Sequence, residues 1–115
     1  MGRPGAQLRT PQMLEALHPG GKSPTRVNRP AYEAFRRAIL RAVPRSRDGV
    51  TFRELPDLVT VHLPEDYRRK FSVMWWTTTV KLDLEARGLI ERVPGATPQR
   101  VRRVISSDAA SNQGQ

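Results

Sequence analysis

Hydrophobic residues recur three or four positions apart in two segments of the chain. Residues 30–43 are the first, and the positions that share one helical face are Tyr32, Phe35, Ile39 and Val43. Asn28 is suited to cap this predicted helix, and Pro44 ends it. Arg37 and Arg41 fall on the opposite side, where they face water or a ligand.

A second helix with a clear apolar face is predicted over residues 72–87. Its inward face consists of Val73, Trp76, Val80 and Leu84. Gly88 follows and is free to take the left-handed conformation that ends many helices. Leu89 is then available to close a Schellman-type contact.

Another apolar strip lies nearly opposite this inward face. It contains Trp75, Leu82 and Ala86, with Thr79 beside it. The most solvent-facing group is then Met74, Thr78, Lys81 and Glu85. An exposed tryptophan in an apolar patch usually marks a contact, so we expect this strip to be an interface. Three alternatives remain for what covers this strip: the arm at residues 13–17, a C-terminal hairpin, or a second copy of the protein.

The segment between these helices predicts a short, irregular helix. Thr51 and Glu54 have the spacing of a capping box, so the helix should begin there. Pro56 removes a hydrogen bond after the first turn, and Pro64 ends the segment. The charged residues 65–70 fit either a loop or the first turns of a longer third helix.

A hairpin is predicted at the C-terminal end, where β-branched and charged runs at 89–93 and 99–105 flank a five-residue loop rich in proline and glycine. Three helices and a hairpin make a mainly α, α+β chain in the element order of a winged helix-turn-helix. The predicted organisation is a disordered tail at 1–12, an arm at 13–29, the winged-helix domain at 30–105 and a disordered tail at 106–115.

Composition narrows the classes of function. The 115 residues include no cysteine, which excludes disulfide bonds, thiolate metal sites and cysteine nucleophiles. No apolar run approaches the roughly 20 residues of a membrane span, and the first residues lack the apolar stretch of a signal peptide. We therefore expect a soluble cytoplasmic protein with no membrane partner.

The net charge is +9, and residues 1–50 carry ten Lys and Arg against three Asp and Glu. Arginine outnumbers lysine 17 to 3, as GC-rich coding would produce. Codon bias does not, however, explain why basic side chains outnumber acidic ones. Polyanions, with double-stranded DNA first, are the expected partners.

Three groups of cations are available for phosphate contacts. They are Arg92, Arg100, Arg102 and Arg103 on the hairpin, Arg68, Arg69 and Lys70 before the third helix, and the N-terminal Arg3, Arg9, Lys22, Arg26 and Arg29. Candidates for contacts to base edges are Met74, Thr77, Thr78 and Lys81. The third helix is itself neutral, so DNA affinity should come mainly from the surrounding arginines. A threonine run and a charged hairpin are also ordinary surface features.

Catalysis, a metal and a cofactor are not expected. His18 and His62 have no metal-ligand spacing to an acidic partner and no serine nucleophile arrangement. His18 is suited to fix a turn with the Pro and Gly that follow it. The acidic pair Asp83 and Glu85 is interpreted as a salt-bridging surface, and Glu65 with Asp66 as charge at a helix start.

Four motifs resemble a family of small uncharacterised bacterial proteins over about residues 17–104. They are His18-Pro19-Gly20, Arg26-Val27-Asn28 leading into Tyr32, the pair Trp75-Trp76 and the run Val80–Gly88. The resemblance implies a winged-helix-like fold and brings no assigned activity. Members of that family tend to have a glycine-rich loop before the tryptophans, where this chain has charged residues 66–70.

Two functions follow as expectations. The first is a DNA-binding winged-helix protein, a transcriptional regulator or nucleoid-associated factor, that contacts phosphates through its basic wing and arm. The alternative is a protein-interaction or dimerisation module that uses the Trp75 and Leu82 surface.

Overall fold

The protein has an α+β architecture in a computed structural model that describes residues 12–104. The helices are α1 (Arg29–Ala42), α2 (Leu55–Thr60), α3 (Glu65–Lys70) and α4 (Val73–Ala86). Two antiparallel sheets consist of β1 (Met13–Ala16) with β2 (Thr25–Asn28), and of β3 (Val50–Thr51), β5 (Arg100–Arg103) and β4 (Ile90–Arg92) in that order. The α+β class is confirmed. Except for Gln12, the predicted tails lie outside the described residues.

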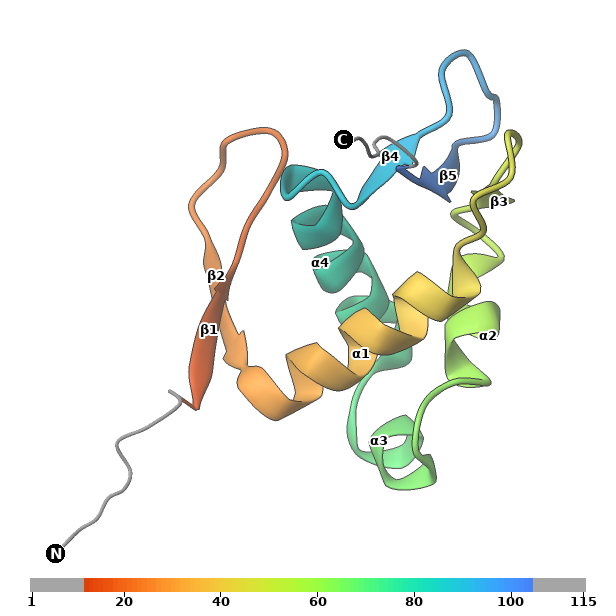
Figure 1. Ribbon diagram of the computed structural model, residues 1–115. Helices are drawn as coiled ribbons and strands as arrows, with labels where there is room; N and C mark the ends of the chain where they lie inside the picture. Colours follow the sequence, from red (N-terminus) through yellow and green to blue (C-terminus); the bar gives the residue numbers. More distant parts are fainter. Residues whose placement is uncertain (1–11, 105–115) are drawn as a thin grey trace, which may run out of the picture.

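Helices α1 and α4 cross at the centre of the core (Figure 1). Phe35 of α1 is fully buried and stacks on Trp76 of α4, with ring centroids 5.5 Å apart and ring planes at 20°. The inward faces predicted for both helices are confirmed, although Val73 is only partly buried. Burial of each large apolar side chain contributes roughly 1.5–3 kcal/mol, so this crossing is a substantial source of stability.

The ends of α4 follow from local sequence. The Ser72 hydroxyl accepts a hydrogen bond from the backbone N–H of Trp75 at 3.2 Å and caps the start of the helix. At the other end Gly88 has φ +79°, and the backbone N–H of Leu89 donates to the Leu84 carbonyl at 2.9 Å. The Gly88 N–H donates to Glu85, which completes the predicted Schellman motif.

The segment between α1 and α4 differs from the prediction in two ways. Thr51 and Glu54 form the reciprocal hydrogen bonds of a capping box, but α2 begins only at Leu55. Residues 52–54 form a turn instead: the Leu55 N–H donates to the Phe52 carbonyl at 3.3 Å, and the Phe52 N–H donates to the Gln99 carbonyl at 3.0 Å. Residues 65–70 are neither a loop nor an extension of α4, because the extended Phe71 separates α3 as a short helix of its own.

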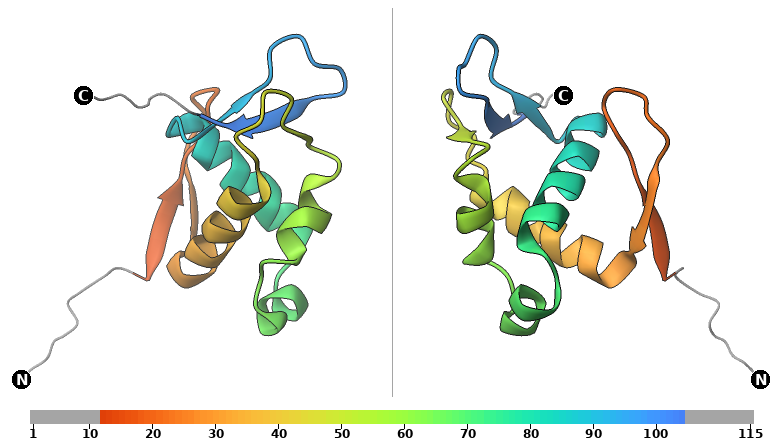
Figure 2. Two further views of the ribbon diagram at one scale, coloured as in Figure 1. Left: turned by 45° about the vertical axis from the view of Figure 1, so that its right-hand side comes forward. Right: turned by 180° about the vertical axis from the view of Figure 1, so that it is seen from behind.

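The arm predicted at residues 13–29 forms a hairpin of β1 and β2, here called the N-terminal hairpin (Figure 2). Leu14 pairs with Val27, and the buried Val27 and Ala16 join the same core as α1 and α4. The sequence pattern predicted neither strand β2 nor this pairing. The hairpin of β4 and β5 was predicted, and its strands pair as Ile90 with Arg103 and Arg92 with Val101.

Candidate functional site

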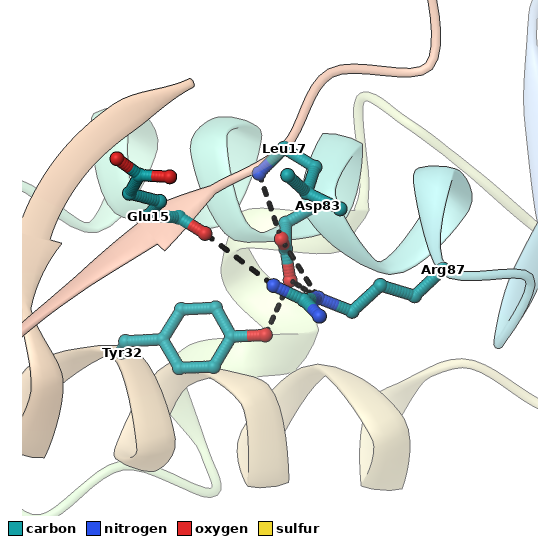
Figure 3. A network of polar contacts seen from close by, with 5 residues as sticks. All are labelled: Glu15, Leu17, Tyr32, Asp83 and Arg87. Carbon is teal, nitrogen blue, oxygen red and sulfur yellow. Dashed lines mark hydrogen bonds and ion pairs between the residues drawn. The ribbon is translucent and has the colours of Figure 1, made fainter.

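Asp83 of α4 is a carboxylate buried where α1, α4 and the N-terminal hairpin meet (Figure 3). The Tyr32 hydroxyl donates to its Oδ2, and the backbone N–H of Leu17 donates to its Oδ1 at 2.8 Å. Arg87 Nε lies 2.9 Å from both carboxylate oxygens, and its Nη2 donates to the Glu15 carbonyl at 3.3 Å. These polar contacts, the Asp83 network, tie the hairpin to both central helices. The interpretation of Asp83 as a surface residue is wrong.

The protonation of the Asp83 network follows from its surroundings. Burial, with a smaller effect from the hydrogen bond to Asp83, raises the pKa of Tyr32 to about 12. The hydrogen bond to Asp83 raises the pKa of Arg87. Tyr32 therefore remains a hydrogen-bond donor and Arg87 remains a cation throughout the neutral range.

The N-terminal hairpin covers only one end of the predicted apolar strip on α4. Its connecting residues, including Leu17 and His18, line a shallow depression together with Glu85 and Ala86. Trp75 at the other end keeps 47% of its surface exposed, and Leu82 is half-buried. Of the three alternatives, the arm therefore covers the strip near Ala86, whereas Trp75 remains exposed to water or to a partner.

Two residues predicted to contact bases are buried on the other side of α4. Lys81 is 2% exposed, and its Nζ lies 2.9 Å from Glu85 Oε2, 3.1 Å from Gln99 Oε1 and 4.6 Å from the centroid of the Phe52 ring. Burial lowers the pKa of Lys81, and the Glu85 carboxylate opposes that shift. The prediction that Lys81 faces solvent is wrong, because Phe52 and the residues before β5 cover it.

Thr77 is the second of these residues. It is fully buried, and its hydroxyl has no hydrogen-bond partner within residues 12–104. It therefore cannot reach a base edge, contrary to the prediction. Met74 and Thr78 do lie outward as predicted: Met74 is 61% exposed, and the partly exposed Thr78 donates its hydroxyl hydrogen bond to the Met74 carbonyl at 2.9 Å.

The arginines of β5 are held by the loop that follows α1. Arg100 Nε donates to the Asp48 carbonyl at 2.8 Å, Arg102 Nη1 to the Arg47 carbonyl at 2.8 Å and Arg103 Nε to the Val43 carbonyl at 3.2 Å. Each guanidinium thus has part of its donor set committed within the fold, although five donors leave some free. These three residues are primarily anchors for the loop.

Other predicted cations divide into paired and unpaired groups. Arg92 forms an ion pair with Glu85 at 3.4 Å, and Arg69 forms one with Glu65 at 3.1 Å. Arg68 and Lys70 on α3 are exposed and have no ion pair among the residues that the structure describes. Arg3 and Arg9 lie outside the described residues.

In the described part of the chain, the largest group of cations without an ion pair lies on α1 and in the loop after it. Arg36, Arg37 and Arg41 form no ion pair or side-chain hydrogen bond within residues 12–104, and the first is half-buried. The exposed Arg45 and Arg47 follow directly in sequence. We call Arg36, Arg37 and Arg41 the α1 arginines. The helical pattern placed Arg37 and Arg41 outward, but none of the three was among the predicted DNA contacts.

Other chemistry is sparse in the described part of the chain. His18 Nδ1 accepts a hydrogen bond from the Gly20 N–H at 2.9 Å, so this side chain does fix a turn. Residues 12–104 contain no group of three or more His, Cys, Asp or Glu side chains placed to hold a metal ion. No helix in that range has the length and apolar character needed to cross a bilayer.

The family of unknown function DUF6958 matches residues 13–101, so the chain belongs to this family. The match extends from the first residue of β1 into β5 and includes the whole Asp83 network. No curated protein and no solved structure matches the chain.

Proposed function

We propose that this member of the DUF6958 family is a winged-helix-type protein that binds the phosphates of double-stranded DNA through the α1 arginines. The observation that carries the proposal is the absence of any ion pair for Arg36, Arg37 and Arg41 within residues 12–104, on a helix whose opposite side is buried. A guanidinium presents a planar set of donors that matches a phosphate. Several such groups on one helix favour an extended polyanion over a single carboxylate.

The order of elements supports a winged-helix arrangement. The three-stranded sheet has the order β3-β5-β4, with α2, α3 and α4 between the first and second of its strands in sequence. In that plan α4 occupies the place of the recognition helix. Its outward side, however, presents Met74, Trp75 and Thr78 without a cation, since Lys81 is buried. The proposed binding is therefore to the DNA backbone and largely independent of sequence, as in a nucleoid-associated factor.

A salt series measured by fluorescence anisotropy on a labelled random-sequence duplex tests this proposal. The α1 variant carries Arg36→Ala, Arg37→Ala and Arg41→Ala, and the matched control carries Arg68→Ala, Arg69→Ala and Lys70→Ala. Each phosphate contact contributes roughly 0.9 to the slope of log affinity against log salt. The slope of the α1 variant should therefore decrease by an amount that corresponds to up to about three phosphate contacts, and the slope of the control should decrease less.

Two results would argue against the proposal. If the control loses slope and the α1 variant does not, the phosphate contacts belong to α3. If the wild-type protein shows no binding at low salt, DNA is not a ligand. The wing arginines are unsuitable for this comparison, because replacing Arg100, Arg102 or Arg103 also releases the loop at residues 43–49.

A second candidate function is protein interaction through the outward side of α4. Met74 and Trp75 are 61% and 47% exposed, and the half-buried Leu82 lies about two turns further along the same helix, so uncharged apolar side chains face solvent here. Light scattering after size exclusion tests for self-association, with Trp75→Glu as the variant. Val61→Glu is the control, because Val61 is 73% exposed and follows α2, away from the strip. A mass that falls only for Trp75→Glu supports an interface here.

A further inference from the structure

A cavity of about 490 Å³ lies beside the first half of α1. The residues around it include Arg29, Arg36, Arg37 and Arg87, together with Tyr32 and Glu33. Among the described residues that line it, Glu33 is the only carboxylate, and it forms an ion pair with Arg29 at 3.4 Å. The cavity therefore carries an excess of positive charge, unlike the two depressions beside the connecting residues of the N-terminal hairpin, both of which include Glu85.

Arg36 is the residue that points most directly to a ligand. It is half-buried, it lines the cavity, and it forms no hydrogen bond or ion pair in the described part of the chain. A guanidinium that is partly removed from water without an anionic partner lowers stability. An anion in the cavity would reverse that loss.

Arg87 lies on the same cavity and is already fixed in position. Its Nε is held by both oxygens of Asp83, whose other hydrogen bonds come from Tyr32 and Leu17. The side chain is still 38% exposed, and a guanidinium has five donors, so part of this group is available to a ligand. A cation held in place by buried groups loses little conformational entropy on binding.

We infer that this cavity binds a small ligand that carries a phosphate or diphosphate group. The guanidinium groups from α1 and from the end of α4 match a phosphate better than a carboxylate, because a phosphate presents three oxygens and up to two charges. Tyr32 and the partly buried Leu14 supply an apolar wall for the remainder of such a ligand. The cavity volume lies within the range typical of small-molecule sites.

Occupancy of this cavity also has a consequence for α4. Tyr32 and Arg87 belong both to the cavity and to the Asp83 network, which joins α1, α4 and the N-terminal hairpin. A phosphate bound to Arg36 and Arg87 therefore links α1 to the end of α4. It raises the stability of the joint between the hairpin and the two helices.

Calorimetric titration with inorganic pyrophosphate tests the inference, with sodium sulfate at equal ionic strength as the charge control. The variants are Arg36→Ala, which lines the cavity, and Arg41→Ala, which removes the same charge from the same helix outside it. Loss of one charge-assisted contact should weaken pyrophosphate binding about tenfold in Arg36→Ala. Arg41→Ala should leave that affinity nearly unchanged, and the melting temperature of the wild-type protein should rise with pyrophosphate.

The inference is overturned if the wild-type protein does not bind pyrophosphate, if sulfate binds equally well, or if both variants weaken binding to the same degree. The last result would mean that general positive charge, and no defined site, holds the anion. The test is separate from the proposed DNA function, although both use Arg36 and Arg37. If the protein binds the duplex but not pyrophosphate, only this inference is wrong. If it binds pyrophosphate but not the duplex, only the DNA proposal is wrong.

Discussion

Helices α1 and α4 have the same length of 14 residues and pack against each other, yet their outward sides have opposite chemistry. The outward side of α1 carries Arg37 and Arg41, which form no ion pair within residues 12–104, whereas that of α4 carries Met74 and Trp75. The charged residues Lys81 and Asp83 of α4 are instead buried among other elements. The difference shows that a charged residue on a helix does not by itself mark the side exposed to solvent.

A physical reason accounts for this difference. α1 packs on its neighbours along one side, so Arg37 and Arg41 stay in water at no desolvation cost, and only Arg36 is half-buried. α4 has the N-terminal hairpin on one flank and Phe52 and Gln99 on the other, so most of its circumference is enclosed. Charges at the enclosed positions persist because each has a partner of opposite charge and further polar contacts. Substitutions that compare a buried position with an exposed position on these helices test this explanation.

The two adjacent tryptophans of α4 should give the largest contrast. Trp76 is 9% exposed and contacts the rings of Phe35 and Phe71, both at 5.5 Å between centroids. Trp76→Ala should lower the free energy of unfolding by about 3–5 kcal/mol through loss of packing. Trp75→Ala should lower it by only about 1 kcal/mol, because Trp75 is already half in water. Urea denaturation measures both, and equal losses would contradict the assignment of the two sides.

The joint between α1 and α4 should show the next largest effect. Asp83→Ala leaves the Tyr32 hydroxyl, the Leu17 N–H and part of Arg87 without an acceptor, and should lower the free energy of unfolding by about 3 kcal/mol. Asp83→Asn keeps one carbonyl oxygen and should lower it less. The same urea series reports both variants. Wild-type stability in Asp83→Ala would mean that apolar contacts alone hold the hairpin.

The same joint predicts a pH dependence at high pH. The folded-state pKa of Tyr32 is about 12, against an ordinary tyrosine value of 10.0. Because the folded value is raised, its stabilising contribution is complete below pH 10 and is lost as the pH rises from there toward 12. Tyrosinate absorbance should therefore show a transition near pH 12 that Tyr32→Phe removes. If Tyr32→Phe still shows that transition, the transition belongs to a group other than Tyr32.

The smallest effect on stability is expected for the α1 arginines. Replacing Arg36, Arg37 and Arg41 together with alanine removes no ion pair or hydrogen bond of the described residues, so the free energy of unfolding should change by only about 0.5 kcal/mol. Chemical denaturation of the same variant used for DNA binding gives this value. A loss of about 2 kcal/mol would instead give these side chains a structural role.

Much of the candidate site lay beyond the reach of sequence patterns. The pattern of α4 placed Trp76, Val80 and Leu84 inward correctly, because those positions depend only on helical periodicity. It placed Lys81 outward, because periodicity carries no information about Phe52 and Gln99, which reach α4 from distant parts of the chain. The burial of Asp83 depends likewise on Tyr32 and Leu17, 51 and 66 residues away in sequence.

The sequence by itself determined the extents of α1 and α4, the glycine turn that ends α4, the C-terminal hairpin and the excess of positive charge. These features depend on neighbouring residues, through periodicity, capping and turn chemistry. Only the tertiary structure decided which charges are available to a ligand. It committed the β5 arginines to carbonyls of the loop after α1, enclosed Lys81 and Asp83, and left the α1 arginines free of ion pairs within residues 12–104. Availability depends on contacts between segments far apart in the chain, which local patterns do not encode.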